Sequence, residues 1–362
     1  MVKQAGELAL RGNWHGKKVM ITGVCGTVGR ELLRQISALS PAEIVGIDNN
    51  ESDLFFLREE YAAFHSVQLY IGDIRDRETL TDKMRGIDIV LHAAALKHVF
   101  LCEQSPRDAV QTNIHGTQNI IDAAIANGVK RVLFTSSDKA VNPTNVMGTS
   151  KLMAERLMSA ANAERRSDGP IFASTRFGNV LGSRGSVIPL FERQIASGGP
   201  VTITDDAMTR FIMTLEEAVR LVIGSTFLAR GGEVFVTKMP VLRIADLAWS
   251  MIQDLAPAHG FAPDDIALDV VGTRPGEKLY EELLNDEETR RTVETDDYFI
   301  ILPALKPHYE IVQYAYVGMR DSKVDEPYNS ALAPTMTREE VRDYLRRNQL
   351  IGVHTEEELQ CA

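Results

Sequence analysis

The chain has 362 residues, of which 44% are apolar and 25% are charged, a composition typical of a soluble globular protein with a sizeable core. A net charge of −11 argues against nucleic acid as the main partner. No apolar run approaches the roughly 20 residues of a membrane helix, and the first residues lack the apolar stretch of a secretory signal. We therefore expect a cytoplasmic protein that binds neither nucleic acid nor membrane.

The cysteines and histidines do not predict a metal centre. Cys25, Cys102 and Cys361 lie far apart without a C-x-x-C pair, which argues against a disulfide framework and against a zinc site. The eight histidines are scattered as well, and His92 and His98 beside an Ala-rich strand end suit packing better than metal ligation. We predict no metal site.

In the first half of the chain, apolar β-branched runs alternate with helical patterns. A long helix that begins near residue 107 is expected to end at Gly128, a natural C-terminal cap. Strands that are apolar on both faces and alternate with helices predict an α/β protein with a doubly wound parallel sheet. The expected strands cover 17–23, 43–50, 67–76, 88–96 and 130–137, and the expected helices cover 30–39 and about 107–128.

The second half is less regular. A sixth strand running into a loop is expected at 171–182, a short β segment at 199–214 and a seventh strand at 232–238, with helices at 215–229 and 243–255. Later elements are short, which suggests a smaller lobe assembled from separate segments over the carboxyl edge of the sheet. The sequence "TREE" at 337–340 is a capping box and predicts a terminal helix.

The stretch "TGVCGTVG" places Gly23, Gly26 and Gly29 directly between a predicted strand and a predicted helix. Glycines there allow a tight turn, close approach of the backbone to a pyrophosphate, and close helix packing, while the helix N-terminus offers N–H groups to phosphates. Asp48 ends the next strand, where a carboxylate accepts hydrogen bonds from ribose hydroxyls. It would repel a 2′-phosphate, so the pattern predicts a Rossmann domain that binds NAD.

A second pattern raises a question about catalysis. Ser137, Met147 and Lys151 have the spacing of the Ser, Tyr and Lys of a short-chain dehydrogenase, but methionine cannot transfer a proton. The adjacent pair Asp138–Lys139 directly follows a predicted strand, at the sheet edge where active sites of α/β proteins lie. This pair is a candidate for the missing acid–base function.

Together these motifs resemble the extended short-chain dehydrogenases that act on nucleotide sugars, and more narrowly the UDP-N-acetylglucosamine 4,6-dehydratases of polysaccharide biosynthesis. The resemblance spans roughly residues 15 to 335, and a branch of that family also has Met beside the same Asp–Lys pair. The resemblance therefore implies that Met147 belongs to the active site together with Ser137, Asp138, Lys139 and Lys151. Its carriers are "TGVCGTVG", "HAAALKHV", "TNIHGTQN", "SSDKAVNPTNVMGTSK", "RFGNVLGSRGSVIPLF" and "GTRPGEKLYEELL".

The resemblance implies a reaction order. C-4 of the hexose is oxidised first, which makes the C-5 hydrogen acidic. C-5 then loses its proton, C-6 loses hydroxide, and the hydride returns to C-6, so NAD stays tightly bound and is regenerated each turnover. The Met-containing branch implies retention at C-5.

The resemblance also implies roles for the residues around the Asp–Lys pair. Lys139 is expected to be the C-5 base, its pKa lowered by desolvation, and Asp138 the acid at C-6, although their roles can be exchanged. Ser137 would bind the C-4 oxygen, and Lys151 would hold the nicotinamide ribose. The proton of the C-4 hydroxyl must then leave through Asp138, Ser137 or a water.

Further contacts follow from the glycine loop and the resemblance, and Arg side chains are suited to diphosphate oxygens. The expected cofactor-binding residues are Gly23, Gly26, Thr27, Val28, Gly29, Asp48, Asp73, Ile74, Ala93, Ala94, Lys97, Asn113 and Lys151. The expected substrate-binding residues are Lys97, Asn179, Arg184, Thr202, Thr204, Arg210, Arg274 and Glu277.

These residues divide the chain into three expected parts. Residues 1–175 with 212–255 form the NAD-binding domain, 176–211 with 256–335 form a nucleotide-sugar-binding lobe, and 336–362 form a terminal helix and tail. Helices near 104–127 and 149–164 are expected to pair across a homodimer or within a larger homo-oligomer, as the resemblance implies.

The sequence leaves three different functions open. A C-4 epimerase would use the same cofactor and substrate, but it would not need the Asp–Lys pair and normally relies on the missing tyrosine. A GDP-sugar 4,6-dehydratase would carry out the same reaction on a different nucleotide. A non-catalytic NAD-binding sensor would bind NAD and convert no sugar.

Overall fold

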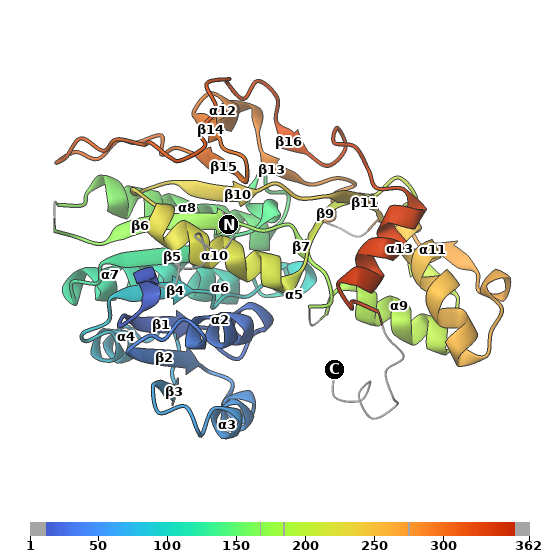
Figure 1. The fold of residues 1–362 in the computed structure, drawn as a ribbon, viewed down its shortest axis with the longest axis horizontal. Coiled ribbons are helices and arrows are strands. Elements are labelled where there is room, and N and C mark those ends of the chain that lie inside the picture. Colours follow the sequence, from blue (N-terminus) through green and yellow to red (C-terminus); the bar gives the residue numbers. More distant parts are fainter. Residues whose placement is uncertain (1–11, 167, 184, 274–275, 352–362) are drawn as a thin grey trace. The chain divides into compact units, whose positions relative to one another are not determined.

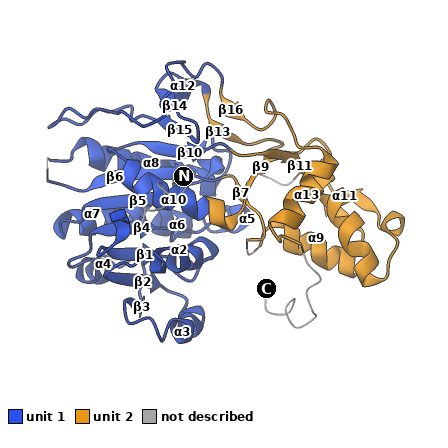
Figure 2. Cartoon of the chain, viewed as in Figure 1, with its two compact units in different colours: residues 1–177, 218–238, 286–326 blue, residues 178–217, 239–285, 327–362 orange. Residues whose placement is uncertain are grey.

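The computed structural model describes residues 12–351 apart from 167, 184 and 274–275. The chain folds into two compact units, coloured separately in Figure 2. Unit 1 contains the chain up to Phe177 together with Ala218–Lys238 and Asp286–Glu326. Unit 2 contains Gly178–Glu217, Met239–Asn285 and the chain from Pro327 onward.

Unit 1 is built on one large sheet, with nine strands in the described residues in the order β14-β15-β10-β6-β5-β4-β1-β2-β3. All pairs are parallel except those of β15, which runs antiparallel to both neighbours. The strands are β1 (Lys18–Thr22), β2 (Glu43–Asp48), β3 (Val67–Ile71), β4 (Ile89–His92), β5 (Arg131–Thr135), β6 (Ile171–Arg176), β10 (Val234–Thr237), β14 (Thr292–Glu294) and β15 (Tyr298–Ile301).

Helices lie on both faces of this sheet (Figure 1), which is why its central strands are continuous apolar runs. On one face, the cluster containing Met20, Ile120 and Phe134 packs the sheet against helices α4, α7 and α8. The helices are α2 (Thr27–Ser37), α3 (Glu51–Glu60), α4 (Arg77–Lys83), α5 (Val99–Gln104), α6 (Pro106–Ala109), a π-helical turn η1 (Val110–His115), α7 (Gly116–Ala126), a 3₁₀ turn η2 (Asp138–Ala140), α8 (Val146–Ala163), α10 (Leu215–Leu228), whose first turn belongs to unit 2, and α12 (Asp286–Thr289).

Unit 2 combines small sheets with helices α9, α11 and α13 around its own core. Phe191, Leu247 and Leu345 bring α9, α11 and α13 into one apolar cluster. The strands pair as β11-β9-β7, β12-β8 and β13-β16. The elements are β7 (Asn179–Val180), α9 (Val187–Ala196), β8 (Val201–Ile203), β9 (Thr209–Met213), β11 (Val241–Arg243), α11 (Ile244–Leu255), the 3₁₀ turns η3 (Ala256–His259) and η4 (Pro263–Asp265), β12 (Leu268–Val270), β13 (Glu282–Leu284), β16 (Tyr328–Asn329) and α13 (Arg338–Arg347).

The predicted fold class, a doubly wound parallel α/β sheet, is confirmed. Several predicted elements have different limits. The strand expected at 67–76 ends at Ile71, because Asp73 and Asp76 form a turn and a helix cap. The helix expected at about 107–128 contains the π turn η1, and the β segment expected at 199–214 is two strands in different sheets.

The division into units differs from the expected domain limits, and two segments account for most of the difference. Residues 286–301 lie in unit 1, because β15 pairs with β10 and extends the main sheet. Residues 239–255 lie in unit 2, because α11 packs against α9 and α13. Over the described parts of the chain, no helix has both the length and the apolar character needed to cross a bilayer.

Candidate functional site

The glycine loop lies at the carboxyl end of β1 and leads into α2. Gly23 has φ +71°, and a Cβ at this residue would lie 2.7 Å from the Cα of Ala94. A Cβ at Gly29 would lie 2.0 Å from the carbonyl oxygen of Gly23. Both positions therefore require glycine: one for the turn and its contact with the neighbouring strand end, the other for close packing of the helix.

This loop presents the N-terminus of α2 at the switch point of the sheet. The strand order reverses between β1 and β4, and the loops after these strands contain Gly23 and Ala93–Ala94. The N-cap of α2 is Gly26, which offers no side chain to the N–H groups of Thr27 and Val28. Helix N–H groups beside a glycine cradle fit the pyrophosphate of a dinucleotide.

Asp48 ends β2 next to the glycine loop. Its Oδ2 accepts a hydrogen bond from the backbone N–H of Cys25 at 2.9 Å, and its Oδ1 accepts one from Asn50 at 3.0 Å. These bonds fix the carboxylate at the strand end, where a ribose would lie beside the loop. The structure thus brings together the glycines and Asp48, which are far apart in the sequence.

The residues expected near the adenine behave differently from one another. Asp73 forms an ion pair with Arg75 at 2.5 Å, and hydrogen bonding to this guanidinium lowers the pKa of the Asp73 carboxyl. The side chain of Ile74 is 5% exposed and packs against Gly116, where a Cβ would lie 2.6 Å from it. Ile74 therefore offers mainly its backbone to an adenine.

His92 is a buried residue at the end of β4. Its Nδ1 is 2.8 Å from the hydroxyl of Thr22 and its Nε2 is 3.2 Å from that of Thr117. Desolvation, with a smaller effect of the Lys151 charge, lowers the pKa of His92 to about 3. The imidazole is therefore neutral and links β1, β4 and α7 beneath the site, in agreement with its predicted packing role.

The turn η2 directly after β5 carries the candidate acid–base pair. The hydroxyl of Ser137 donates to Asp138 Oδ1 at 2.6 Å, and Nζ of Lys139 contacts Asp138 Oδ2 at 2.9 Å. Asp138 is 3% exposed, and its backbone N–H donates to the carbonyl of Phe177 at the end of β6. One buried carboxylate thus contacts both a hydroxyl and the side-chain amino group of a lysine.

Lys151 is a buried residue of α8 that reaches the end of β5. Its Nζ donates to the carbonyl oxygen of Thr135 at 2.9 Å and lies 4.6 Å from the ring centroid of Phe134. Burial lowers the pKa of Lys151 to about 8, and the carboxylate of Glu155 opposes this shift. The ammonium is therefore close to its titration range near neutral pH.

Met147 occupies the tyrosine position at the start of α8. Its side chain is 3% exposed and belongs to a small apolar cluster with Cys102 of α5 and Ala109 of α6. The helix comes close to η2, because a Cβ at Gly148 would lie 2.1 Å from the carbonyl oxygen of Lys139. Position 147 thus contributes packing at the site and no proton donor.

Asn113 lies in the π turn η1 and is 2% exposed, so it is not a surface residue of a helix. Its amide exchanges two hydrogen bonds with the backbone of Leu96, at 2.8 and 3.0 Å, and donates to Ser150 Oγ at 2.8 Å. Ser150 precedes Lys151, so Asn113 fixes the loop after β4 against α8. Lys97 follows Leu96 and is exposed.

Apart from Lys97, which lies in unit 1, the predicted sugar-nucleotide residues that the structure describes lie in unit 2. The amide of Asn179 donates to the carbonyl of Phe211 at 3.0 Å and to Glu281 at 2.6 Å. Arg210 contacts Glu281 at 3.3 Å and donates to the carbonyl of Lys278 at 2.9 Å. Glu281 is only 4% exposed and joins the two candidates, although the sequence pattern did not predict it as a site residue.

The other candidates in unit 2 form smaller groups. Thr202 is bonded through its hydroxyl to Gln194 at 2.8 Å, while the hydroxyl of Thr204 is 3.5 Å from Glu277. Arg184 and Arg274 lie outside the described residues. In the described part of the chain, no group of three or more His, Cys, Asp or Glu side chains is arranged to hold a metal ion.

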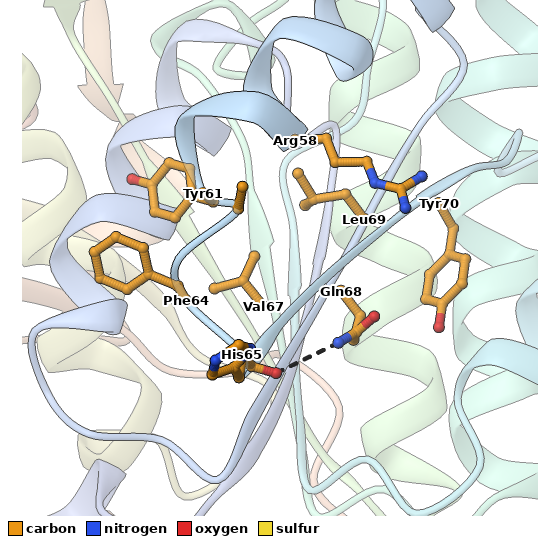
Figure 3. A pocket seen from close by; sticks show the side chains of 9 residues that line it. Arg58, Tyr61, Phe64, His65, Val67, Gln68, Leu69 and Tyr70 are labelled. Carbon is orange, nitrogen blue, oxygen red and sulfur yellow. Dashed lines mark hydrogen bonds between the residues drawn. The ribbon is translucent and has the colours of Figure 1, made fainter.

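A separate pocket of about 320 Å³ lies between α3 and β3 at the edge of the main sheet (Figure 3). Arg58, Tyr61, His65 and Gln68 are among its lining residues, and Gln68 donates to the carbonyl of His65 at 3.4 Å. None of the predicted site residues lines it.

The chain is similar to known proteins over most of its length. A family model described as polysaccharide biosynthesis protein matches residues 19–303. An uncharacterized membrane protein of Methanocaldococcus jannaschii is 44% identical over 330 residues, covering 91% of this chain and 95% of that protein. A UDP-N-acetylglucosamine 4,6-dehydratase (inverting) of Campylobacter jejuni is 39% identical over 297 residues, covering 81% and 85%. The solved structure of Pen from Bacillus thuringiensis superposes with a TM-score of 0.85 at 40% identity, covering 94% of this chain and 99% of that chain.

Two further relatives differ in length or in named activity. The chain is 44% identical over 284 residues to the probable polysaccharide biosynthesis protein EpsC of Bacillus subtilis, but it spans only 46% of that protein's length and 75% of its own. A UDP-glucose 4-epimerase of Rickettsia canadensis is 37% identical over 336 residues, covering 91% of this chain and 95% of that protein. The chain belongs to the polysaccharide biosynthesis protein family.

Proposed function

We propose that the chain is an NAD-dependent nucleotide-sugar 4,6-dehydratase that converts a UDP-N-acetylhexosamine, UDP-N-acetylglucosamine in the first instance, to a UDP-4-keto-6-deoxy sugar. The observation that carries this proposal is the buried Asp138 carboxylate, in contact with Ser137 at 2.6 Å and with Lys139 at 2.9 Å. A relative named UDP-N-acetylglucosamine 4,6-dehydratase, 39% identical over 81% of the chain, supports the choice of reaction and substrate.

The residues present fit the cofactor. The cradle of Gly23, Gly26 and Gly29 would receive the pyrophosphate at the α2 N-terminus, and Asp48 would bind the adenine ribose. Lys151 would hold the nicotinamide ribose. When bound, NAD supplies a hydride acceptor for C-4 and returns the hydride to C-6.

The contacts of Asp138 supply a proton path that needs no tyrosine. Ser137 binds the C-4 hydroxyl and passes its proton to Asp138 as C-4 is oxidised. The protonated Asp138 then donates to the C-6 oxygen, which leaves as water, while Lys139, which enters this step as the neutral amine, removes the C-5 proton and later gives it back. The C-4 hydroxyl proton and the C-6 hydroxyl form the water that is lost, so the step balances without an external reductant.

The first test is to incubate the purified protein with UDP-N-acetylglucosamine carrying deuterium at C-4, without added cofactor. We expect a product lighter by one water, with the deuterium at C-6 by NMR and no net NADH. Proton couplings at C-5 then distinguish the retention that the Met-containing branch implies from the inversion in the name of the Campylobacter relative.

Other outcomes select other functions. An unchanged mass with UDP-N-acetylgalactosamine appearing would make the protein a C-4 epimerase, the activity named for the Rickettsia relative. Turnover of GDP-sugars but not of UDP-sugars would make the protein a GDP-sugar 4,6-dehydratase. Bound NAD with no conversion of any sugar would indicate a sensor.

A further inference from the structure

A fully buried group of charges lies next to the candidate site in unit 1. Arg176, the last residue of β6, is 1% exposed and contacts two carboxylates, Glu155 of α8 at 3% and Glu288 of α12 at 2%. Arg176 donates to Glu155 through Nε at 3.0 Å and through Nη2 at 2.8 Å. It donates to Glu288 through Nη1 and Nη2, both at 2.8 Å.

Such a group is costly to bury unless every member is satisfied, and apolar residues would pack there at lower cost. Two bidentate pairs on one guanidinium fix β6, α8 and α12 to one another more rigidly than apolar contacts would. We therefore expect this cluster to contribute a precise arrangement of β6, α8 and α12 more than stability.

Two of the three elements so joined hold the candidate site. Arg176 is followed by Phe177, whose carbonyl oxygen accepts the backbone N–H of Asp138 at 2.9 Å. Glu155 lies four residues after Lys151, on the same face of α8. The cluster thus acts on the acid–base turn through β6 and on the buried lysine through α8.

We propose that Arg176, Glu155 and Glu288 are positioning residues that hold Lys151 and the Asp138–Lys139 turn in their working arrangement. This inference rests on the proposed function for its catalytic consequence. Glu155 also acts through its charge. Because it raises the pKa of Lys151 against the larger effect of burial, it helps keep this ammonium charged near neutral pH. His92 and Cys102 are the other titratable groups coupled to Lys151.

The test compares Glu155→Gln with Glu288→Gln. Each change removes the negative charge of one carboxylate that is paired with the Arg176 guanidinium, but only Glu155 shares a helix with Lys151. We expect Glu155→Gln to lower the pKa of Lys151, because the carboxylate charge that raises it is lost. The alkaline limbs of the pH profiles of kcat and of NAD affinity should shift to lower pH with it. Glu288→Gln should lower the melting temperature without moving the limb.

A readout independent of turnover is the ¹³Cε resonance of Lys151 in lysine-labelled protein, assigned by its loss in Lys151→Arg. If this resonance titrates identically in the wild type and in Glu155→Gln, the electrostatic role is wrong. If the titration midpoint shifts in Glu155→Gln but the wild-type protein dehydrates no sugar, the proposed function is wrong while the electrostatic coupling of Glu155 to Lys151 is confirmed.

Arg176→Lys provides a second test that does not depend on folding of Glu155→Gln. Lysine keeps the positive charge but cannot form bidentate hydrogen bonds to two carboxylates, because it lacks the planar guanidinium. A positioning role predicts a kcat at least about ten-fold lower in folded protein, with the limb at its wild-type pH. A lower melting temperature with wild-type kcat would mean that the cluster is only structural.

Discussion

At the residue scale, the proposed chemistry depends most on Asp138. Its carboxylate accepts from the hydroxyl of Ser137 and from the side-chain amino group of Lys139, while its backbone is tied to the end of β6. Met147, in contrast, is packed among apolar side chains. The structure therefore separates a residue that can transfer protons from one that fills space.

Conservative changes at Asp138 and at Met147 are expected to have opposite effects on activity. Asp138→Asn should lower kcat by at least about 100-fold, because the amide cannot accept or donate the required proton. Met147→Leu, which keeps the volume, should cost less than about 1.5 kcal/mol of stability and keep most of the activity. Steady-state kinetics and thermal unfolding measure both. A large loss of kcat in Met147→Leu would show that the thioether has a chemical role.

His92 predicts a pH dependence of stability. Its folded-state pKa of about 3 lies below the usual value near 6.5, so below pH 6.5 the unfolded chain binds a proton that the native protein does not. The free energy of unfolding should therefore fall by about 2 kcal/mol through this group between pH 7 and pH 5. Urea unfolding of the wild type and of His92→Gln at both pH values measures it. Equal pH dependence in the two proteins would contradict the prediction.

At the scale of elements, the site depends on how closely η2 and α8 approach. The two are adjacent in sequence, but their contact is possible only because Gly148 has no Cβ. The π turn η1 has a similar effect on the other side of α8, since it directs Asn113 toward Ser150 and the loop after β4. Local backbone features thus set the position of Lys151.

Gly148→Ala tests this contact. A methyl group 2.1 Å from the carbonyl oxygen of Lys139 must displace the turn or the helix, so we expect a loss of about 1–3 kcal/mol and a fall in kcat. Gly12→Ala is the matched control, because a Cβ there meets nothing within 4 Å. Wild-type kcat in Gly148→Ala would mean that the turn tolerates displacement.

At the scale of the whole molecule, the two units are interleaved in sequence. Each is assembled from three segments, so neither can be separated by one cut. Unit 1 needs residues 286–301 both to cover the edge of β10 with β15 and to supply Glu288 to Arg176.

A chain that lacks residues 286–326 but keeps the segments of unit 2 tests this dependence. It would expose the edge of β10, a template for intermolecular pairing, and would leave Arg176 with one carboxylate partner fewer. We expect insoluble protein or a broad, non-cooperative thermal transition by circular dichroism, against a cooperative transition of the full chain. A soluble, cooperatively folding product would show that the first strands suffice.

Local sequence determined much of this protein. Apolar runs separated by helical patterns predicted the parallel sheet, because a strand buried on both faces must be apolar throughout. The spacing of Gly23, Gly26 and Gly29, and the position of Asp138–Lys139 after β5, predicted one sheet edge as the site. These features depend on neighbours in the chain, and so they can be read from it.

Only the tertiary structure decided what depends on residues distant in the chain. Glu281 joins Asn179 to Arg210, and Glu288 reaches Arg176 from 112 residues away. A charged residue in a short segment has the sequence pattern of a solvated side chain, whether or not it is buried. Its burial depends on which strands pair and which helices cover them, and these contacts form only when the whole chain has folded.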